Sequence, residues 1–191
     1  ALNLIRTGCA KTILTGGSES MLCFGGIKAW EGLRIMSKEA CRPFCATRDG
    51  MVQGEGAAIF IFEEYEQAIN RGANIFAEVA GFSMSSDASD IVNPNMDGAA
   101  RAIAGALIDA KLNINEIGYI NAHGTGTIAN DKTECDAIKK VFKEQAKDLM
   151  ISSTKSMHGH LIGGTGALEL LSCILAINEG IIPPTINFKQ N

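Results

Sequence analysis

Three histidines and a lysine lie in two short turns rich in Gly, Ser and Thr, and they are the side chains best suited to chemistry. His123 lies in "NAHGTGT", and Lys155, His158 and His160 lie in "SSTKSMHGH". Each turn follows an apolar stretch typical of a buried β-strand and precedes a helical pattern. Because ligands of open α/β sheets bind at the carboxyl ends of strands, we expect His123 and Lys155 to lie together at that edge of the sheet.

The rest of the chain alternates between strand and helix patterns, which favours a mostly parallel sheet with helices on its faces. The predicted strands are 11–17, 56–65, 75–85, 117–123 and 148–155. The predicted helices are 1–8, a turn or two within 25–36, 63–72, 97–112, 130–145 and 163–180. The strand at 56–65 is strongly apolar and is predicted to be buried on both faces. Asp97 is a candidate N-cap of one helix, and the next helix is predicted to start at Asn130 or Asp131.

Composition excludes several classes of protein. Hydrophobic residues make up 46% of the 191, which is ample for a core, and a net charge of −4 without a basic run argues against nucleic acid. We find no apolar stretch of the roughly 18 residues that span a membrane, and no secretory signal. Six scattered cysteines without a C-x-x-C pair indicate reduced, structural thiols in a cytoplasmic protein. The pattern that starts at Ala1 is already typical of the middle of a helix, so we expect this sequence to be a piece of a longer chain.

Other kinds of site fit parts of the two turns. Residues 124–129 match the dinucleotide fingerprint G-x-G-x-x-A, but Asp148 precedes the next strand, whereas the fingerprint needs an acidic residue at that strand's end. The three histidines could ligate zinc, but Lys155 would add positive charge beside the metal. A structural role for all three is the third interpretation, and it is the favoured one for His158 alone.

The chain resembles the β-ketoacyl synthases, the condensing enzymes of fatty-acid and polyketide synthesis, in "NAHGTGT", "DKTE" and "STKSMHGH" with the Gly-rich helix start that follows. Three further stretches are similar to the family: "CRPFCATRDGMVQGEGAAIF", "TGGSES" and "GIIPPTIN". The resemblance covers essentially the whole chain and implies an α/β fold of the layered thiolase type, incomplete at both ends. Residues 1–72 would then end the N-terminal half, and 73–191 would form most of the C-terminal half.

The resemblance also implies roles for individual residues. In the family a cysteine holds the acyl chain, and two histidines and a lysine act on the incoming malonyl thioester. Carried over to this sequence, the histidines are His123 and His160 and the lysine is Lys155. His158 then occupies a variable position. None of the six cysteines lies in the strained turn that carries the family's nucleophile, so we expect that residue to lie outside the chain.

Three more residues match supporting positions of the family. Glu134 matches a glutamate near the lysine, and a charge-assisted hydrogen bond from Lys155 to Glu134 is expected to order the His123 loop. Thr125 and Thr127 match threonines that contact the pantetheine arm.

The residue types suit the implied chemistry. Decarboxylation of a malonyl thioester produces an enolate, whose oxygen needs hydrogen-bond donors aimed at it. Two neutral imidazoles can supply them if the proton is on the correct nitrogen. A helix at 163–180 begins just past His160, and its positive end should disfavour the imidazolium form.

The resemblance therefore implies a decarboxylative Claisen condensation of an acyl thioester with malonyl-acyl carrier protein. No cofactor is expected, since the substrates are carried on the phosphopantetheine of the acyl carrier protein. The implied partners are this carrier protein and a second copy in a homodimer, without nucleic acid or membrane. The alternative is a non-catalytic thiolase-fold partner subunit, like those that set chain length.

Overall fold

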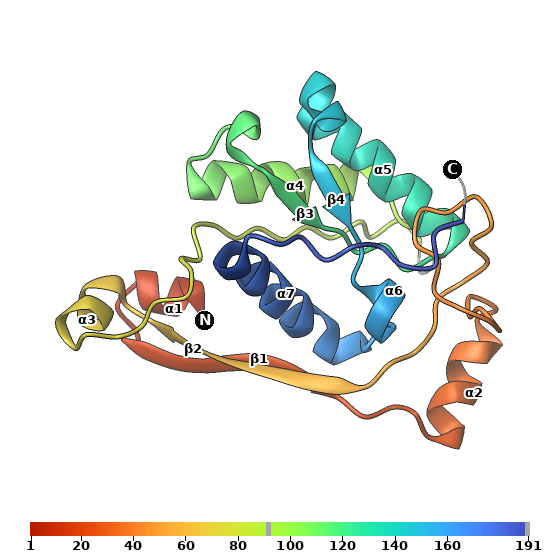
Figure 1. Ribbon diagram of the computed structural model, residues 1–191, viewed down its shortest axis with the longest axis horizontal. Helices are drawn as coiled ribbons and strands as arrows, with labels where there is room; N and C mark the ends of the chain where they lie inside the picture. Colours follow the sequence, from red (N-terminus) through yellow and green to blue (C-terminus); the bar gives the residue numbers. More distant parts are fainter. Residues whose placement is uncertain (91–92, 190–191) are drawn as a thin grey trace.

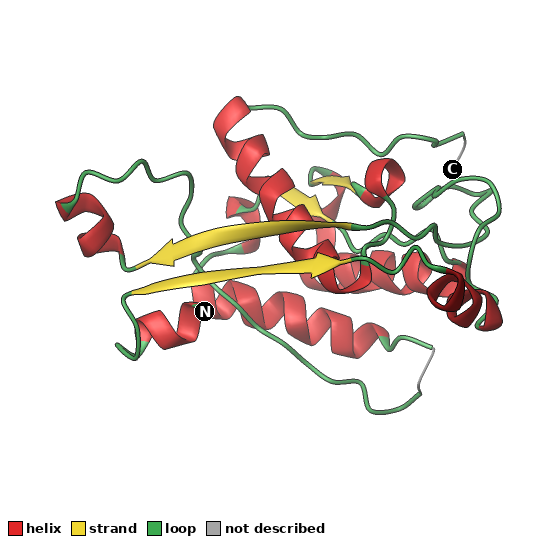
Figure 2. Cartoon of the chain, turned by 90° about the horizontal axis from the view of Figure 1, so that it is seen from below, coloured by secondary structure: helices red, strands yellow, loops and turns green. Residues whose placement is uncertain are grey.

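The computed structural model describes residues 1–90 and 93–189. In residues 1–72, two long strands form an antiparallel ribbon flanked by short helices. These elements are α1 (Leu2–Arg6), β1 (Thr12–Glu19), α2 (Phe24–Gly32), β2 (Gly56–Glu63) and α3 (Tyr65–Asn70). The ribbon pairs Thr12 with Glu63 at one end and Glu19 with Gly56 at the other, and Figure 2 shows the two strands side by side.

The described residues after 92 form helices around a short parallel pair of strands. The helices and 3-10 turns are α4 (Met96–Ala110), η1 (Ile114–Glu116), α5 (Ile128–Phe142), η2 (Lys143–Lys147), α6 (Lys155–His158), η3 (Ile162–Gly164) and α7 (Thr165–Glu179). The strands are β3 (Tyr119–Asn121) and β4 (Met150–Ser152). They are parallel and in register from Tyr119 opposite Met150, so their carboxyl ends meet at one edge.

The elements stack in layers, with α7 in the middle (Figure 1). Helices α4 and α5 pack on each other and, with β3, enclose the main apolar core. α7 contacts β3 and also both strands of the ribbon. This helix is therefore the element that joins the ribbon to the parallel strands.

The main core is built by α5 and the residues just before β4. Ile138, Phe142 and Leu149 are at most 8% exposed. Partly buried hydrophobic residues surround them: Ile103, Leu107, Ile114, Ile117, Ile120, Val141 and Ala146. The four-residue spacing of Ile138 and Phe142 puts both on one face of α5. This packing fixes α5 against Ile120 of β3 and against Leu149, which lies just before β4. The candidate site residues follow these two strands in the chain.

Most predicted elements are present, but some details are wrong. Residues 73–90 form no strand, contrary to the prediction for 75–85, because no neighbouring strand pairs with them. Asn95 caps α4, accepting a hydrogen bond from the Asp97 backbone N–H at 2.8 Å, whereas Asp97 sits in the first turn. α5 begins at Ile128 after Thr127, two residues before its predicted start.

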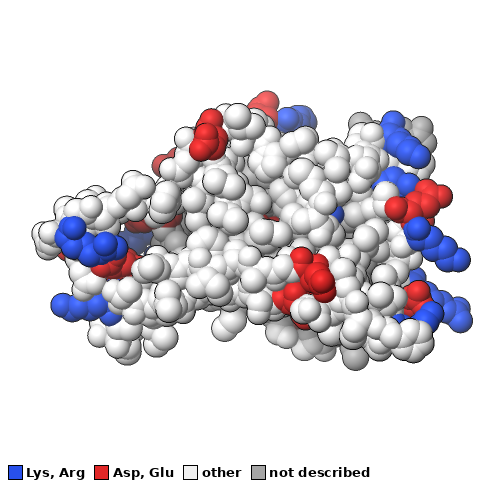
Figure 3. All heavy atoms as spheres, turned by 60° about the horizontal axis from the view of Figure 1, so that its bottom comes forward, with Lys and Arg blue, Asp and Glu red and all other residues white. Residues whose placement is uncertain are grey.

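The ribbon has one covered face and one open face, and the view with the bottom of Figure 1 turned forward shows few charged side chains over its middle (Figure 3). Leu14, Ile59 and Ile61 are 73%, 64% and 63% exposed. Leu14 pairs with Ile61, and side chains two residues apart on a strand point to the same side. The prediction that β2 is buried on both faces is wrong for this chain, because α7 covers only the other face of the ribbon.

One stretch is long and apolar enough to cross a membrane by length and composition, contrary to the expectation from sequence. It is Ile162–Glu179, with a mean hydropathy of 1.2. The stretch carries Glu169, which is ion-paired to the buried Lys155. α7 also packs on the ribbon and on β3, although Thr165 is its one buried residue and Leu175 and Ile177 are 50% and 68% exposed.

We expect this chain to self-associate through the open ribbon face, because an exposed apolar patch lowers its free energy when it is covered. Sedimentation velocity over a concentration series should show larger species, and the double variant Leu14→Lys/Ile61→Lys should shift them towards monomer. Phe24→Lys is the control, since Phe24 is 80% exposed on α2, away from the ribbon face. A chain that stays monomeric at every concentration would contradict this expectation.

Candidate active site

The parallel strands bring the predicted residues together. His123 follows β3 by two residues, and Lys155, which begins α6, follows β4 by three. The chain then turns back through Gly159 (φ 74°) to His160. The imidazole rings of His123 and His160 lie edge to face, with centroids 5.2 Å apart. His123 and Lys155 therefore follow the carboxyl ends of neighbouring parallel strands, as predicted, and two imidazoles meet at this edge.

His160 is held firmly on both its backbone and its ring. Its backbone N–H donates to the Val52 carbonyl at 2.7 Å, and its carbonyl accepts from the Gly54 N–H at 3.0 Å. Its ring nitrogen Nδ1 accepts from the Ile162 N–H at 3.0 Å, with the Thr165 hydroxyl also at 3.0 Å. An acceptor Nδ1 places the proton of the neutral ring on Nε2. Nε2–H is then the donor that can face a substrate.

Both imidazoles are kept neutral by their surroundings. Desolvation, followed by the positive charge of Lys155, lowers the pKa of His160 to about 4. The same two causes, in the same order, lower the pKa of His123, although that residue keeps an exposed side. The predicted neutral state thus rests mainly on burial and on a neighbouring cation.

Lys155 is fully buried, and its partner differs from the predicted one. Its ammonium donates a hydrogen bond to Glu169 of α7, not to Glu134. Burial raises the pKa of Glu169, and the Lys155 charge opposes that rise. The predicted Lys155–Glu134 hydrogen bond is therefore wrong. Sequence reasoning missed Glu169, although a single carboxylate in the middle of an apolar helix was a signal for a buried partner.

Glu134 orders the His123 loop directly. Its two carboxylate oxygens accept from the backbone N–H groups of His123 at 2.7 Å and Gly124 at 2.8 Å. Burial raises the pKa of Glu134, while these two N–H groups act in the opposite direction. The loop thus has its own carboxylate anchor, separate from the one that holds Lys155.

The rest of this loop is fixed by a buried aspartate. Asp131 is 1% exposed and accepts from the backbone N–H groups of Phe44 at 2.8 Å and Gly126 at 3.2 Å. Gly126 has φ 80°, and a Cβ there would lie 2.8 Å from the Gly50 carbonyl oxygen. The sequence pattern predicted Asp131 only as a possible helix start and not in this role.

The two threonines lie on the same loop as His123. The hydroxyls of Thr125 and Thr127 are 2.9 Å apart, and Thr125 is buried. Their assignment to a pantetheine arm stays a prediction. The turn also has little room for a dinucleotide phosphate, because a Cβ at Gly124 would lie 2.5 Å from the Cβ of Ser153.

The His158 ring makes different contacts from those of the His160 ring. Its Nδ1 donates to the Gly159 carbonyl at 2.7 Å, and its Nε2 is buried without a hydrogen-bond partner among the residues that the structure describes. Desolvation lowers its pKa as well. Within residues 1–90 and 93–189, no three His, Cys, Asp or Glu side chains converge on a point that could hold a metal ion.

The chain belongs to the β-ketoacyl synthase family. Residues 1–68 match the N-terminal domain of β-ketoacyl synthase, and residues 76–189 match its C-terminal domain. The fold is accordingly that of the thiolase-type ketosynthases. It is similar to an ishigamide ketosynthase/chain length factor, with a TM-score of 0.94 and 42% identity, covering 100% of this chain and 46% of that one.

Several relatives are similar over the whole chain. It is 50% identical over 190 residues to nodulation protein E of Rhizobium leguminosarum bv. trifolii, covering 47% of that protein. It is 45% identical over 198 residues to 3-oxoacyl-[acyl-carrier-protein] synthase 2 of Synechocystis sp., covering 48%. A structure of AntDE with AntF, described as a type II PKS acyl-carrier protein in complex with its ketosynthase, has a TM-score of 0.96 at 39% identity, covering 100% of this chain and 49% of that one. The chain thus spans about half the length of these relatives.

The pKa shifts predict how the site responds to pH. An unfolded histidine titrates near about 6.5, so the unfolded chain takes up protons before the folded imidazoles do. Stability should therefore fall as the pH drops from about 6.5 to the folded pKa of about 4 for His160, and this contribution should level off below that pH. Nitrogen NMR of isotope-labelled histidines should find His160 neutral, with the proton on Nε2, at mildly acidic pH.

Lys155→Met should raise the pKa of His160, because a nearby cation disfavours the imidazolium form. Lys132→Met is the matched control, since Lys132 is an exposed lysine paired with Asp136. A His160 that titrates near the ordinary value in the unsubstituted chain would contradict this account.

Proposed function

We propose that the protein to which this chain belongs is an active β-ketoacyl synthase, which condenses an acyl thioester with malonyl-acyl carrier protein. The observation that carries the proposal is the pair of neutral imidazoles, with His160 restricted to the tautomer that donates from Nε2. In this reaction the malonyl group loses CO₂, and the resulting enolate carbon attacks the acyl thioester. The new carbon–carbon bond forms as the carbon–sulfur bond to the enzyme breaks.

His123 and His160 are proposed to stabilise the enolate oxygen. Donors fixed before the reaction cost no reorganisation when the charge develops, and they are strongest where water is excluded. Glu134 would hold the His123 loop, and Thr125 and Thr127 would contact the pantetheine arm. No cofactor is proposed, since the thioester activates the substrate.

The acyl-carrying cysteine is proposed to lie in a part of the protein outside this chain. Cys41 contacts the Thr125 carbonyl at 3.5 Å, but burial raises the pKa of its thiol to about 11. A thiol with so high a pKa is almost never the reactive thiolate. Reduced thiols fit the cytoplasm, and the partners we propose are an acyl carrier protein and a second copy of the enzyme.

A non-catalytic partner subunit is the second candidate, and the similarity to a ketosynthase/chain length factor supports keeping it. A non-catalytic subunit would need no pair of imidazole donors, whereas this chain carries both imidazoles with a buried lysine beside them. Formation of the 3-oxoacyl-acyl carrier protein product by the full-length natural protein distinguishes the two, because condensation needs the acyl-carrying cysteine, whereas decarboxylation needs only the donor pair.

We expect His160→Ala in the full-length natural protein to slow malonyl decarboxylation and condensation by about 100-fold or more, or about 3 kcal/mol, as for the loss of an oxyanion donor. His158→Ala, which removes a neighbouring imidazole of the same turn, should stay within a few-fold of the parent rate. Steady-state decarboxylation of malonyl-acyl carrier protein measures both. Equal, severe losses at the two positions would refute the assignment.

Lys155 and Glu169 should behave as one unit. Removing either partner leaves a buried charge unpaired, and residues of one unit lose function non-additively. Lys155→Met and Glu169→Gln should each slow decarboxylation, and the double variant should be little worse than the worse single one.

The same cycle with Glu134→Gln is the matched comparison, because Glu134 makes no hydrogen bond to Lys155 in the described structure. Its loss should combine more nearly multiplicatively with that of Lys155→Met. Multiplicative losses for the Lys155–Glu169 pair would show that the two act independently.

A further inference from the structure

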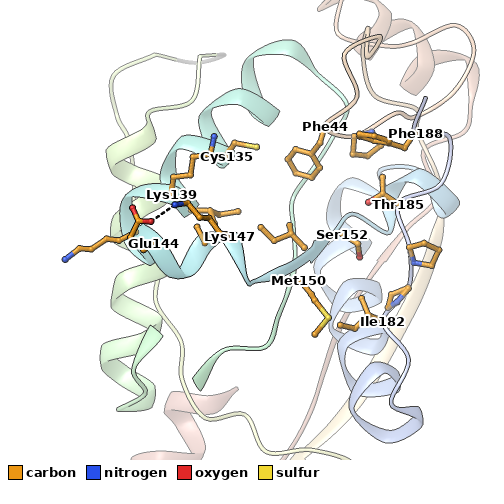
Figure 4. Close-up of a pocket in the computed structure, with 17 residues that line it drawn as sticks. Phe44, Cys135, Lys139, Glu144, Lys147, Met150, Ser152, Ile182, Thr185 and Phe188 are labelled. Atoms are coloured by element: carbon orange, nitrogen blue, oxygen red, sulfur yellow. Dashed lines mark hydrogen bonds and ion pairs between the residues drawn. The ribbon is translucent and has the colours of Figure 1, made fainter. Parts of the chain in front are cut away.

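A second concave site lies behind the His123 loop, and the proposed condensation does not use it. It is a cavity of about 980 Å³ between α5, η2, β4 and the segment 182–188 (Figure 4). This volume is near the upper end of the roughly 300–1,000 Å³ typical of small-molecule sites. Its walls are mainly apolar and include Phe44, Ile138, Met150, Ile151, Ile182 and Phe188.

The apolar walls remain open to solvent. Met150 is 54% exposed, Phe188 43% and Ile151 39%. Figure 4 shows Phe44 and Phe188 on one side of the space and α5 on the other, with Met150 and Ser152 of β4 below the two phenylalanines in this view. Because exposed apolar surface is costly in water, this space favours an occupant with an apolar body.

The helical rim of the cavity is positively charged. Lys139, Lys143 and Lys147 all line it, and Glu144 is the acidic residue among its lining side chains. Lys147 is paired with Glu144 at 2.5 Å. Lys139 and Lys143 are exposed and make no ion pair with any residue in 1–90 or 93–189. Lys139 interacts electrostatically with the nearby carboxylate of Asp136, but neither ammonium group is held in an ion pair within the described residues. Both can therefore meet an anion at the edge of an apolar space, although the chain as a whole is net acidic.

The cavity is separate from the imidazole pair but touches the loop that carries His123. The Ser153 N–H donates to the hydroxyl of Thr185, which lines the cavity, at 3.0 Å. The Ser153 hydroxyl in turn donates to the Gly124 carbonyl at 2.7 Å. Ser153 is completely buried and so forms a wall between the two sites.

We propose that this cavity binds a single-chain amphipathic anion, namely a fatty carboxylate. The hydrocarbon chain lies among Phe44, Met150 and Ile182, and the carboxylate meets Lys139 and Lys143. A peptide strand added to the open edge of β4 is the competing occupant. The structure favours the fatty carboxylate, because β4 offers only three residues for pairing and a strand would not use the free ammonium groups.

Calorimetric titration of dodecanoate, below the concentration at which it forms micelles, tests the proposal on the 191-residue chain and on the full-length natural protein. Saturable binding to one site is expected in both. Lys139→Gln/Lys143→Gln should weaken it about fivefold to thirtyfold, as for the loss of two exposed ion pairs, and raising the salt concentration should have the same direction of effect. Met150→Trp, which places a larger ring where the hydrocarbon chain is proposed to lie, should also weaken it.

Lys11→Gln/Lys38→Gln is the matched control, since it removes the same charge from exposed lysines outside the cavity, and it should leave the affinity unchanged. Equal binding of dodecyltrimethylammonium, or no effect of the rim substitutions, would overturn the proposal. Binding to the 191-residue chain but not to the full-length protein would overturn it as well, since the cavity would then be filled by the protein itself. None of these measurements involves condensation, so the proposed enzyme activity can fail or hold independently.

Discussion

The buried ammonium group of Lys155 is the constraint on which the site depends. A charge with no exposed surface is costly by several kcal/mol unless a partner is placed beside it. The partner, Glu169, comes from α7, so the end of β4 and the middle of α7 must meet. Because α7 also packs on the ribbon, the same ion pair fixes how the two parts of the chain sit around the imidazoles.

The same positive charge contributes to the chemistry without touching a reacting atom. Neutral imidazoles are needed for donation to an enolate, and a cation nearby disfavours their protonation. Desolvation is the larger cause for both rings, and Lys155 is the next. A lysine paired to a carboxylate is a poor base near neutral pH. We therefore regard Lys155 as a positioning and electrostatic residue, and His123 and His160 as the proposed contacts to substrate.

The sequence predicted the location of the site better than its internal contacts. His123 and Lys155 each follow a short apolar strand, and parallel strands bring their carboxyl ends together. Which carboxylate reaches the lysine depends on how helices pack, and no local pattern contains that information. Glu134 was the expected partner because it lies in a recognised motif, whereas Glu169, the partner in the structure, lies in none of the motifs. The expected strand at 75–85 failed for a related reason, since a strand exists only where another strand pairs with it.

The apolar pattern of β2 contains information that this chain alone does not satisfy. Ala57 to Phe62 are apolar without interruption, as in strands covered on both faces. In the structure α7 covers one face, and Ile59 and Ile61 remain exposed on the other. The pattern therefore predicted the burial of β2 wrongly for this chain. It indicates that the strand needs a second layer to cover its other face. Such a layer has to come from outside residues 1–90 and 93–189, either from further polypeptide or from another copy. The site lies between α7 and the parallel strands, on the side of the ribbon that is already covered, so its geometry does not depend on which of these supplies the layer.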